Sequence, residues 1–122
     1  MAYDPNNIFA RILRGEIPSK KVHEDQHTLA FLDIAPQTKT HILVIPKGAY
    51  VSWDDFSANA SDAEIAAFVR AVGKVARDAG LAEPGYRILA NIGRDGRQEV
   101  PHLHVHVFGG QDLGRMIKPA EK

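Results

Sequence analysis

The residues with the most distinctive chemistry are three histidines that alternate with apolar residues in the segment Pro101 to Gly110. Successive side chains of a β-strand point to opposite faces. The spacing of His102, His104 and His106 therefore predicts a strand over residues 102–108 with all three imidazoles on one face. The apolar residues between them would lie on the other face, toward the helices. Because half of the 6 histidines of the chain gather on one face, we expect this face to have a function.

Three aligned imidazoles allow three interpretations. The first is a polar sheet face with solvated histidines. The second is a Zn²⁺ site in which His41 supplies the missing ligand, because three histidines spread along one strand are too far apart to bind one ion together. The third is nucleophilic catalysis at phosphorus, in which one neutral imidazole attacks and its neighbours serve as acids, bases and hydrogen-bond donors.

Residues upstream of the histidines favour the third interpretation. Asn91 and Gln98 are neutral hydrogen-bond donors, and the glycine-bearing turn at 93–97 can offer backbone N–H groups to an anion. The sequence has neither a Walker-type glycine loop nor an obvious carboxylate cluster for Mg²⁺. We therefore expect phosphorus chemistry that needs no metal and no cofactor.

Length and composition narrow the class of protein. The chain has 122 residues, of which 44% are hydrophobic and 25% charged, as in a single globular domain. Its 15 basic and 15 acidic side chains balance, which argues against a nucleic-acid partner. No apolar run is long enough to span a membrane and no signal peptide is recognisable, so we expect a cytoplasmic protein. The lack of cysteine excludes disulfides, thiolate nucleophiles and cysteine-based zinc sites.

The elements expected to position the histidines are short. We predict a first helix capped by Asn6 or Asn7 and ended by Gly15, and a longer helix over residues 61–79 that starts with a capping box. The predicted strands cover residues 21–24, 29–34, 40–45, 86–92 and 102–108. Because most connections are too short for a crossover helix, we expect an antiparallel α+β sheet with helices on one side and the strand 40–45 near its centre.

The segment His-Leu-His-Val-His-Val-Phe resembles the signature of the histidine triad (HIT) superfamily of nucleotide hydrolases and transferases. The similarity points to the histidine triad nucleotide-binding (Hint) branch and covers roughly residues 7–111, which leaves residues 112–122 as a variable tail. The chain is thus expected to be a single HIT domain over residues 1–122. The similar segments are Ile8-Phe9, Gly15 to Pro18, Glu24-Asp25, Leu29 to Phe31, Asp33-Ile34, Pro36-Gln37, Thr40 to Lys47, Gly85 to Arg87, Asn91 and Gly96 to Gly110.

The resemblance implies a five-stranded antiparallel sheet with two helices, paired into a homodimer with a continuous sheet. It also implies binding of a purine mononucleotide and attack at its α-phosphorus. His104 would be the nucleophile that forms a nucleotidyl-histidine intermediate, and His106 would contact the phosphate and assist the leaving group. His102 would orient the site, and His41 would support the triad from the neighbouring strand.

The same resemblance implies the nucleotide contacts. Asp33 would bind the ribose hydroxyls, for which a short carboxylate is chemically suited, although it is also a plausible turn-former. At the phosphate end we expect contacts from Asn91, Arg97, Gln98 and Glu99. The base pocket would be lined by apolar residues that are equally plausible in the core, namely Ile8, Phe9, Ile12, Phe31, Ile34 and Leu43.

The third histidine of the motif favours hydrolysis over transfer. Transferases of the galactose-1-phosphate uridylyltransferase branch carry glutamine where this chain has His106. The resemblance thus implies hydrolysis of the P–N bond in purine nucleoside 5'-phosphoramidates. Three alternatives stay open: a dinucleoside polyphosphate hydrolase like the Fhit branch, a nucleotide-binding or signalling protein with incidental hydrolysis, and a zinc enzyme that uses His102, His104 and His41.

The chain also departs from the family pattern. Many relatives hold Zn²⁺ with a Cys-x-x-Cys pair, but Asn7 and Ala10 occupy the corresponding positions here, so we expect no structural zinc. Glu99 stands where serine or threonine is common, and Arg97 stands where glycine is common. A carboxylate beside a phosphate repels it unless it is protonated or paired, so the preference for the leaving group does not carry over.

Overall fold

The computed structural model describes residues 1–120, and the last two residues of the predicted tail 112–122 lie outside this part. A five-stranded sheet has the order β1-β2-β3-β5-β4 with every neighbouring pair antiparallel, which confirms the predicted α+β fold. In chain order the elements are α1 (Ile8–Leu13), β1 (Lys21–Glu24), β2 (Thr28–Leu32), β3 (Thr40–Pro46), α2 (Trp53–Asn59), α3 (Asp62–Asp78), β4 (Arg87–Leu89) and β5 (Val105–Gly109).

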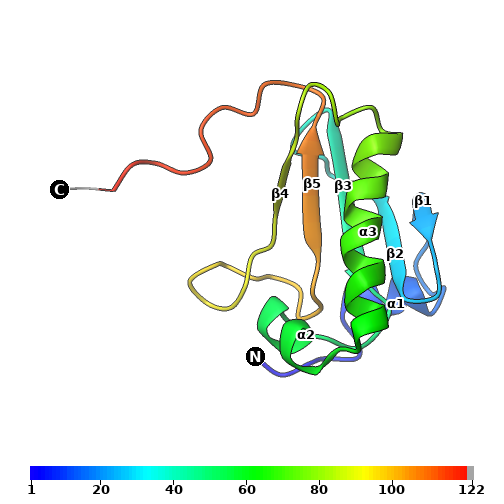
Figure 1. Ribbon diagram of the computed structural model, residues 1–122. Coiled ribbons are helices and arrows are strands. Elements are labelled where there is room, and N and C mark those ends of the chain that lie inside the picture. The colour runs from blue at the N-terminus through cyan, green and yellow to red at the C-terminus, as the bar shows by residue number, and fades with distance from the viewer. Residues whose placement is uncertain (121–122) are drawn as a thin grey trace.

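Helices cover both faces of the sheet, whereas the sequence pattern predicted them on one side. The long helix α3 lies across one face (Figure 1), where its apolar stripe forms a core with Ala30, Val44 and Val107. The short helix α1 packs on the opposite face, where it forms a second cluster. This cluster consists of Phe9, Ile12, Leu29, Phe31, Leu43 and Ile45. Because β2 and β3 carry apolar residues on both faces, each face needs its own cover, and β3 is central as predicted.

Local capping explains where the helices begin. The side chain of Asn7 accepts hydrogen bonds from the first turn of α1, and Ser61 and Glu64 form the predicted capping box of α3. The structure adds a third helix, α2, to the two that were predicted. It begins at the N-cap Ser52 and buries a single aromatic side chain, Phe56, so its seven residues have too little periodicity to be recognised in the sequence.

Strands β4 and β5 are shorter than predicted, and this correction affects the histidines. Pairing of β3 with β5 ends at Val44 and Val105, so residues 102–104 precede the strand as an extended segment. The next residues of β3 lead to Pro46, which has no N–H group to donate to a ladder. The backbone N–H of Leu103 donates instead to the Tyr50 carbonyl at 2.8 Å.

Beyond β5 the chain has no regular secondary structure up to residue 120. The guanidinium of Arg87 on β4 donates a hydrogen bond to the carbonyl of Gly114 at 2.8 Å. From there the chain runs away from the sheet (Figure 1). No helix within residues 1–120 is both long and apolar enough to cross a membrane.

Candidate active site

The three histidines of the motif lie on the face that α1 covers, although only His106 belongs to β5. The intervening apolar residues point toward α3, so the predicted alternation of faces holds through the segment before the strand. The ring centroids of His104 and His106 are 5.2 Å apart, and the Phe9 ring lies 4.9 Å from that of His104. His102 is fully buried behind them.

The hydrogen bond of His104 determines which ring nitrogen can react. Its Nδ1 lies 2.8 Å from the backbone carbonyl of His102, and a carbonyl only accepts, so Nδ1 carries the proton. Nε2 of the neutral ring is then left with a free lone pair. His104 lines the largest described cavity, so this arrangement allows its ring to act as a nucleophile.

His41 and His106 form a second pair with defined protonation. The backbone N–H of Gln37 donates to Nδ1 of His41 at 3.2 Å, so the proton of this ring is on Nε2. That nitrogen lies 2.9 Å from Nδ1 of His106 and donates to it. Nδ1 of His106 is therefore the acceptor, and its Nε2 carries a proton that is free to be donated. His106 is thus a hydrogen-bond donor beside His104.

Burial keeps these imidazoles neutral. Loss of solvent lowers the pKa of His102 and of His106 to about 4, and the nearby rings of His104 and His41 contribute to the shift of His106. Burial also lowers the pKa of His41, although the negative charge of Asp33 opposes this. The pKa of His104 is lowered for the same reason, against the hydrogen bond to His102 and the charges of Asp33 and Glu99. The nucleophilic, unprotonated form therefore predominates at neutral pH.

A cavity of ≈ 620 Å³ on the α1 face brings most of the predicted site residues together. His104 and His106 line it together with apolar side chains from α1, β2 and β3. The predicted residues that line it are Ile8, Phe9, Ile12, Phe31, Asp33, Ile34, Leu43, Asn91, Arg97, Glu99, His104 and His106. Residues that the sequence did not suggest also line it, among them Ile17, Pro18, Ser19, Gln37 and Val100. Most of these belong to connections, where no periodic pattern marks a binding residue.

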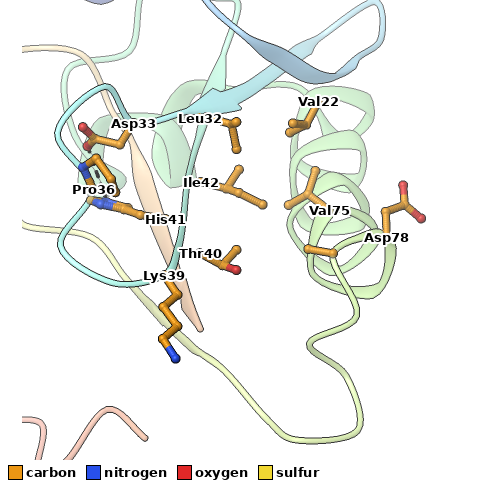
Figure 2. Close-up of a pocket in the computed structure, with 11 residues that line it drawn as sticks. Val22, Leu32, Asp33, Pro36, Lys39, Thr40, His41, Ile42, Val75 and Asp78 are labelled. Atoms are coloured by element: carbon orange, nitrogen blue, oxygen red, sulfur yellow. Dashed lines mark ion pairs between the residues drawn. The ribbon is translucent and has the colours of Figure 1, made fainter. Parts of the chain in front are cut away.

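Asp33 has two roles in the structure. One carboxylate oxygen accepts the backbone N–H of Ala35 at 2.8 Å, so the alternative interpretation as a turn-former is correct for that oxygen. The other oxygen lies 3.5 Å from Nε2 of His41, and Figure 2 shows the two side chains next to each other. They also line a smaller cavity of ≈ 370 Å³ between the sheet and α3 (Figure 2). Asp33 therefore lines the larger cavity and also contacts His41 of the histidine pair.

Gln98 is a correction to the predicted nucleotide contacts. Its side chain is buried, its amide nitrogen donates to the carbonyls of Val51 and Val100, and its amide oxygen accepts the N–H of Gly93. These bonds hold the loop at 93–98 and leave no free donor for a ligand. In the same loop Arg97 has φ +57°, the left-handed region that favours glycine.

A zinc site made of His102, His104 and His41 does not fit this geometry. Both ring nitrogens of His102 are engaged, Nε2 with the Pro46 carbonyl at 2.8 Å and Nδ1 with the Tyr3 hydroxyl at 2.7 Å. Both nitrogens of His41 are engaged as well. Among residues 1–120, the ligand atoms that do approach one another within 4.8 Å belong to Asp33, His41 and His106, and a metal there would have to break the bond between the two histidines.

Comparisons with known proteins agree with this geometry. A family model described as HIT domain matches residues 14–113. An uncharacterized HIT-like protein of Azospirillum brasilense is 73% identical over 115 residues, which are 94% of each chain. A purine nucleoside phosphoramidase of Escherichia coli is 44% identical over 110 residues, 90% of this chain and 92% of that protein. A histidine triad protein from Clostridium difficile superposes with a TM-score of 0.82 at 39% identity, covering 95% of this chain and 100% of the other. The chain therefore belongs to the HIT family.

Proposed function

We propose that this protein is a metal-independent hydrolase that cleaves the P–N bond of purine nucleoside 5'-phosphoramidates through a nucleotidyl intermediate on His104. The observation that carries the proposal is the free lone pair on Nε2 of a neutral His104 at the wall of a nucleotide-sized cavity. The E. coli relative named purine nucleoside phosphoramidase supports the same substrate class.

The arrangement supports a two-step reaction. Nε2 of His104 attacks the α-phosphorus, a new P–N bond forms and the P–N bond to the amine breaks, and the amine leaves with one proton taken from water. The intermediate is a positively charged imidazole whose Nδ1–H stays bonded to the His102 carbonyl, which stabilises that charge. Water then forms a P–O bond and releases AMP and neutral His104, and it returns one proton to solvent. His106 would donate its Nε2–H to a phosphate oxygen during both steps.

The cavity has the two kinds of lining side chain, apolar and polar, that a purine mononucleotide requires. Apolar side chains from α1, β2 and β3 offer faces on which a base can pack, while His104 and His106 offer polar groups to a phosphate. Asp33, which also lines the cavity, would accept hydrogen bonds from the ribose hydroxyls with its remaining lone pairs.

The proposal is tested by comparing rates on two substrates after exhaustive chelation. We expect sustained turnover of adenosine 5'-phosphoramidate and much slower cleavage of diadenosine polyphosphates. A preference for the P–O–P substrate would instead make the protein a dinucleoside polyphosphate hydrolase. Loss of activity on chelation that Zn²⁺ restores would overturn the metal-independent mechanism. Binding of AMP without turnover of either substrate would favour a nucleotide-binding or signalling role.

Replacing Glu99 with glutamine is expected to raise kcat/KM for phosphoramidates with neutral leaving groups. Glu99 is exposed and lines the cavity, and its negative charge repels the phosphate through partly aqueous surroundings. Removing that charge should increase kcat/KM about threefold, and the gain should shrink as ionic strength rises. Asp95→Asn removes a charge from an exposed residue of the same loop that does not line the cavity, so it serves as the control. An unchanged or lower kcat/KM for the Glu99 variant would show that its carboxylate assists the substrate.

We also propose that the protein forms a homodimer through the exposed edge of β4. Ile88 of β4 has 53% of its surface exposed, and it shares an apolar hollow of ≈ 530 Å³ with Trp53, Val69 and Tyr86. An unpaired edge strand beside an apolar surface is suited to pairing with a second copy of itself.

Sedimentation of the wild-type protein should therefore give a dimer, and Ile88→Lys should give a monomer. Ile117→Lys places the same charge on an exposed isoleucine of the C-terminal segment and should leave the dimer intact. A wild-type monomer at micromolar concentration would contradict this assembly.

A further inference from the structure

The N-terminal segment reaches the active site through one side chain that the sequence motif does not include. The hydroxyl of Tyr3 lies 2.7 Å from Nδ1 of His102, which is 99 residues away in the chain. The two rings also contact each other, with centroids 5.5 Å apart. Tyr3 itself is half-buried.

The other nitrogen of His102 identifies the donor in this bond. Nε2 lies 2.8 Å from the carbonyl of Pro46, which only accepts, so Nε2 carries the proton of the neutral ring. Nδ1 is then an acceptor, and the Tyr3 hydroxyl donates to it. Because His102 is fully buried, no solvent reaches Nδ1 to replace this donor.

His102 in turn holds the nucleophile. Its backbone carbonyl accepts the Nδ1–H of His104 at 2.8 Å, and this bond orients the His104 ring and keeps its Nε2 unprotonated. Residues 102–104 lie outside the β5 ladder, so the side-chain bonds of His102 and the backbone bond from Leu103 to Tyr50 hold this segment where strand pairing is missing. A shift of the His102 ring therefore also moves the backbone carbonyl of His102, and the orientation of the His104 ring changes with it.

We propose that Tyr3 is a positioning residue of the active site: its hydroxyl fixes the orientation of the His102 ring and, through the His102 carbonyl, the direction of the His104 lone pair. The catalytic consequence rests on the proposed function of His104. Tyr3 contacts neither the substrate cavity nor the reacting atoms.

The variant Tyr3→Phe removes the hydroxyl and keeps the ring. We expect kcat for adenosine 5'-phosphoramidate to fall about tenfold with little change in KM. The Nε2 lone pair of His104 would no longer be held in line with the phosphorus atom, while the base pocket stays intact. In ¹⁵N NMR spectra of histidine-labelled protein, the variant should keep the Nε2–H tautomer of His102, because the Pro46 carbonyl still accepts that proton. It should shift the signal of His102 Nδ1, which loses its donor, and the signals of His104. Tyr50→Phe is the matched control, because it removes a hydroxyl that bonds only Glu64, and it should change neither kcat nor these signals.

Each outcome of these measurements either supports or overturns the positioning role of Tyr3. Unchanged His102 signals in Tyr3→Phe would show that the hydroxyl does not hold the His102 ring, and changed His102 signals with wild-type kcat would overturn the positioning role. If the wild-type protein does not hydrolyse phosphoramidates, the proposed function fails by itself. The positioning role of Tyr3 is then judged by whether the variant shifts the His104 signals, and unshifted signals would overturn it.

Discussion

Replacing His104 with alanine is expected to lower kcat for phosphoramidate hydrolysis by about 10³-fold or more, because it removes the lone pair that we propose attacks phosphorus. AMP should still bind within a few-fold of the wild-type affinity, since the apolar walls and Asp33 stay in place. Steady-state rates and calorimetric titration with AMP separate these two effects. Mass spectrometry of rapidly denatured wild-type protein should find the nucleotidyl adduct on the peptide that contains His104.

Two further variants separate chemistry from packing. His104→Asn keeps an N–H donor near the position of Nδ1, so it preserves the bond to the His102 carbonyl better than alanine and should be equally inactive. His27→Ala removes a histidine that does not line the cavity and should keep the wild-type rate. A His104→Ala protein that folds, binds AMP and turns over at the wild-type rate would show that the nucleophile lies elsewhere.

Local patterns in the sequence correctly predicted the structural features that depend only on residues close together in the chain. Alternation placed the histidines opposite the apolar residues, and this holds even where His102 and His104 precede the strand. The capping box of α3 was visible for the same reason, because Ser61 and Glu64 are three residues apart. Such features need only the period of a strand or the geometry of one helical turn.

What the sequence did not predict depends on contacts between distant segments. Gln98 has the chemistry of a ligand donor, yet the carbonyls of Val51 and Val100 use its amide. Tyr3 lies at the N-terminus and gains its partner only when α1 and the extended segment before β5 meet on the same face. The position of α1 follows from the apolar residues on both faces of the central strands, and their pattern alone does not say which helix covers which face.

Acid is expected to destabilise this fold strongly between pH 6.5 and 4. Burial lowers the pKa of His102 and of His106 to about 4, whereas both side chains titrate near 6.5 in the unfolded chain. The unfolded state therefore binds more protons in this interval, so the stabilisation is fully present above pH 6.5 and is lost as the pH falls. Each group contributes about 3 kcal/mol at most, which together is a large part of the stability of a small domain.

Urea unfolding at several pH values measures this loss through its slope. Between pH 5 and 6 we expect the free energy of unfolding to fall by about 2 kcal/mol or more per pH unit, which corresponds to nearly two protons. Hydrogen bonds and nearby cations lower the pKa of carboxylates such as Glu24 and Asp78. These groups take up protons only at lower pH, so the slope between pH 5 and 6 reports on the histidines. His102→Gln retains a donor for the Pro46 carbonyl but does not titrate, so it should reduce the slope by about one proton. A wild-type slope well below one proton in this window would show that His102 and His106 are already protonated in the folded protein, and it would remove the basis for a neutral triad at acidic pH.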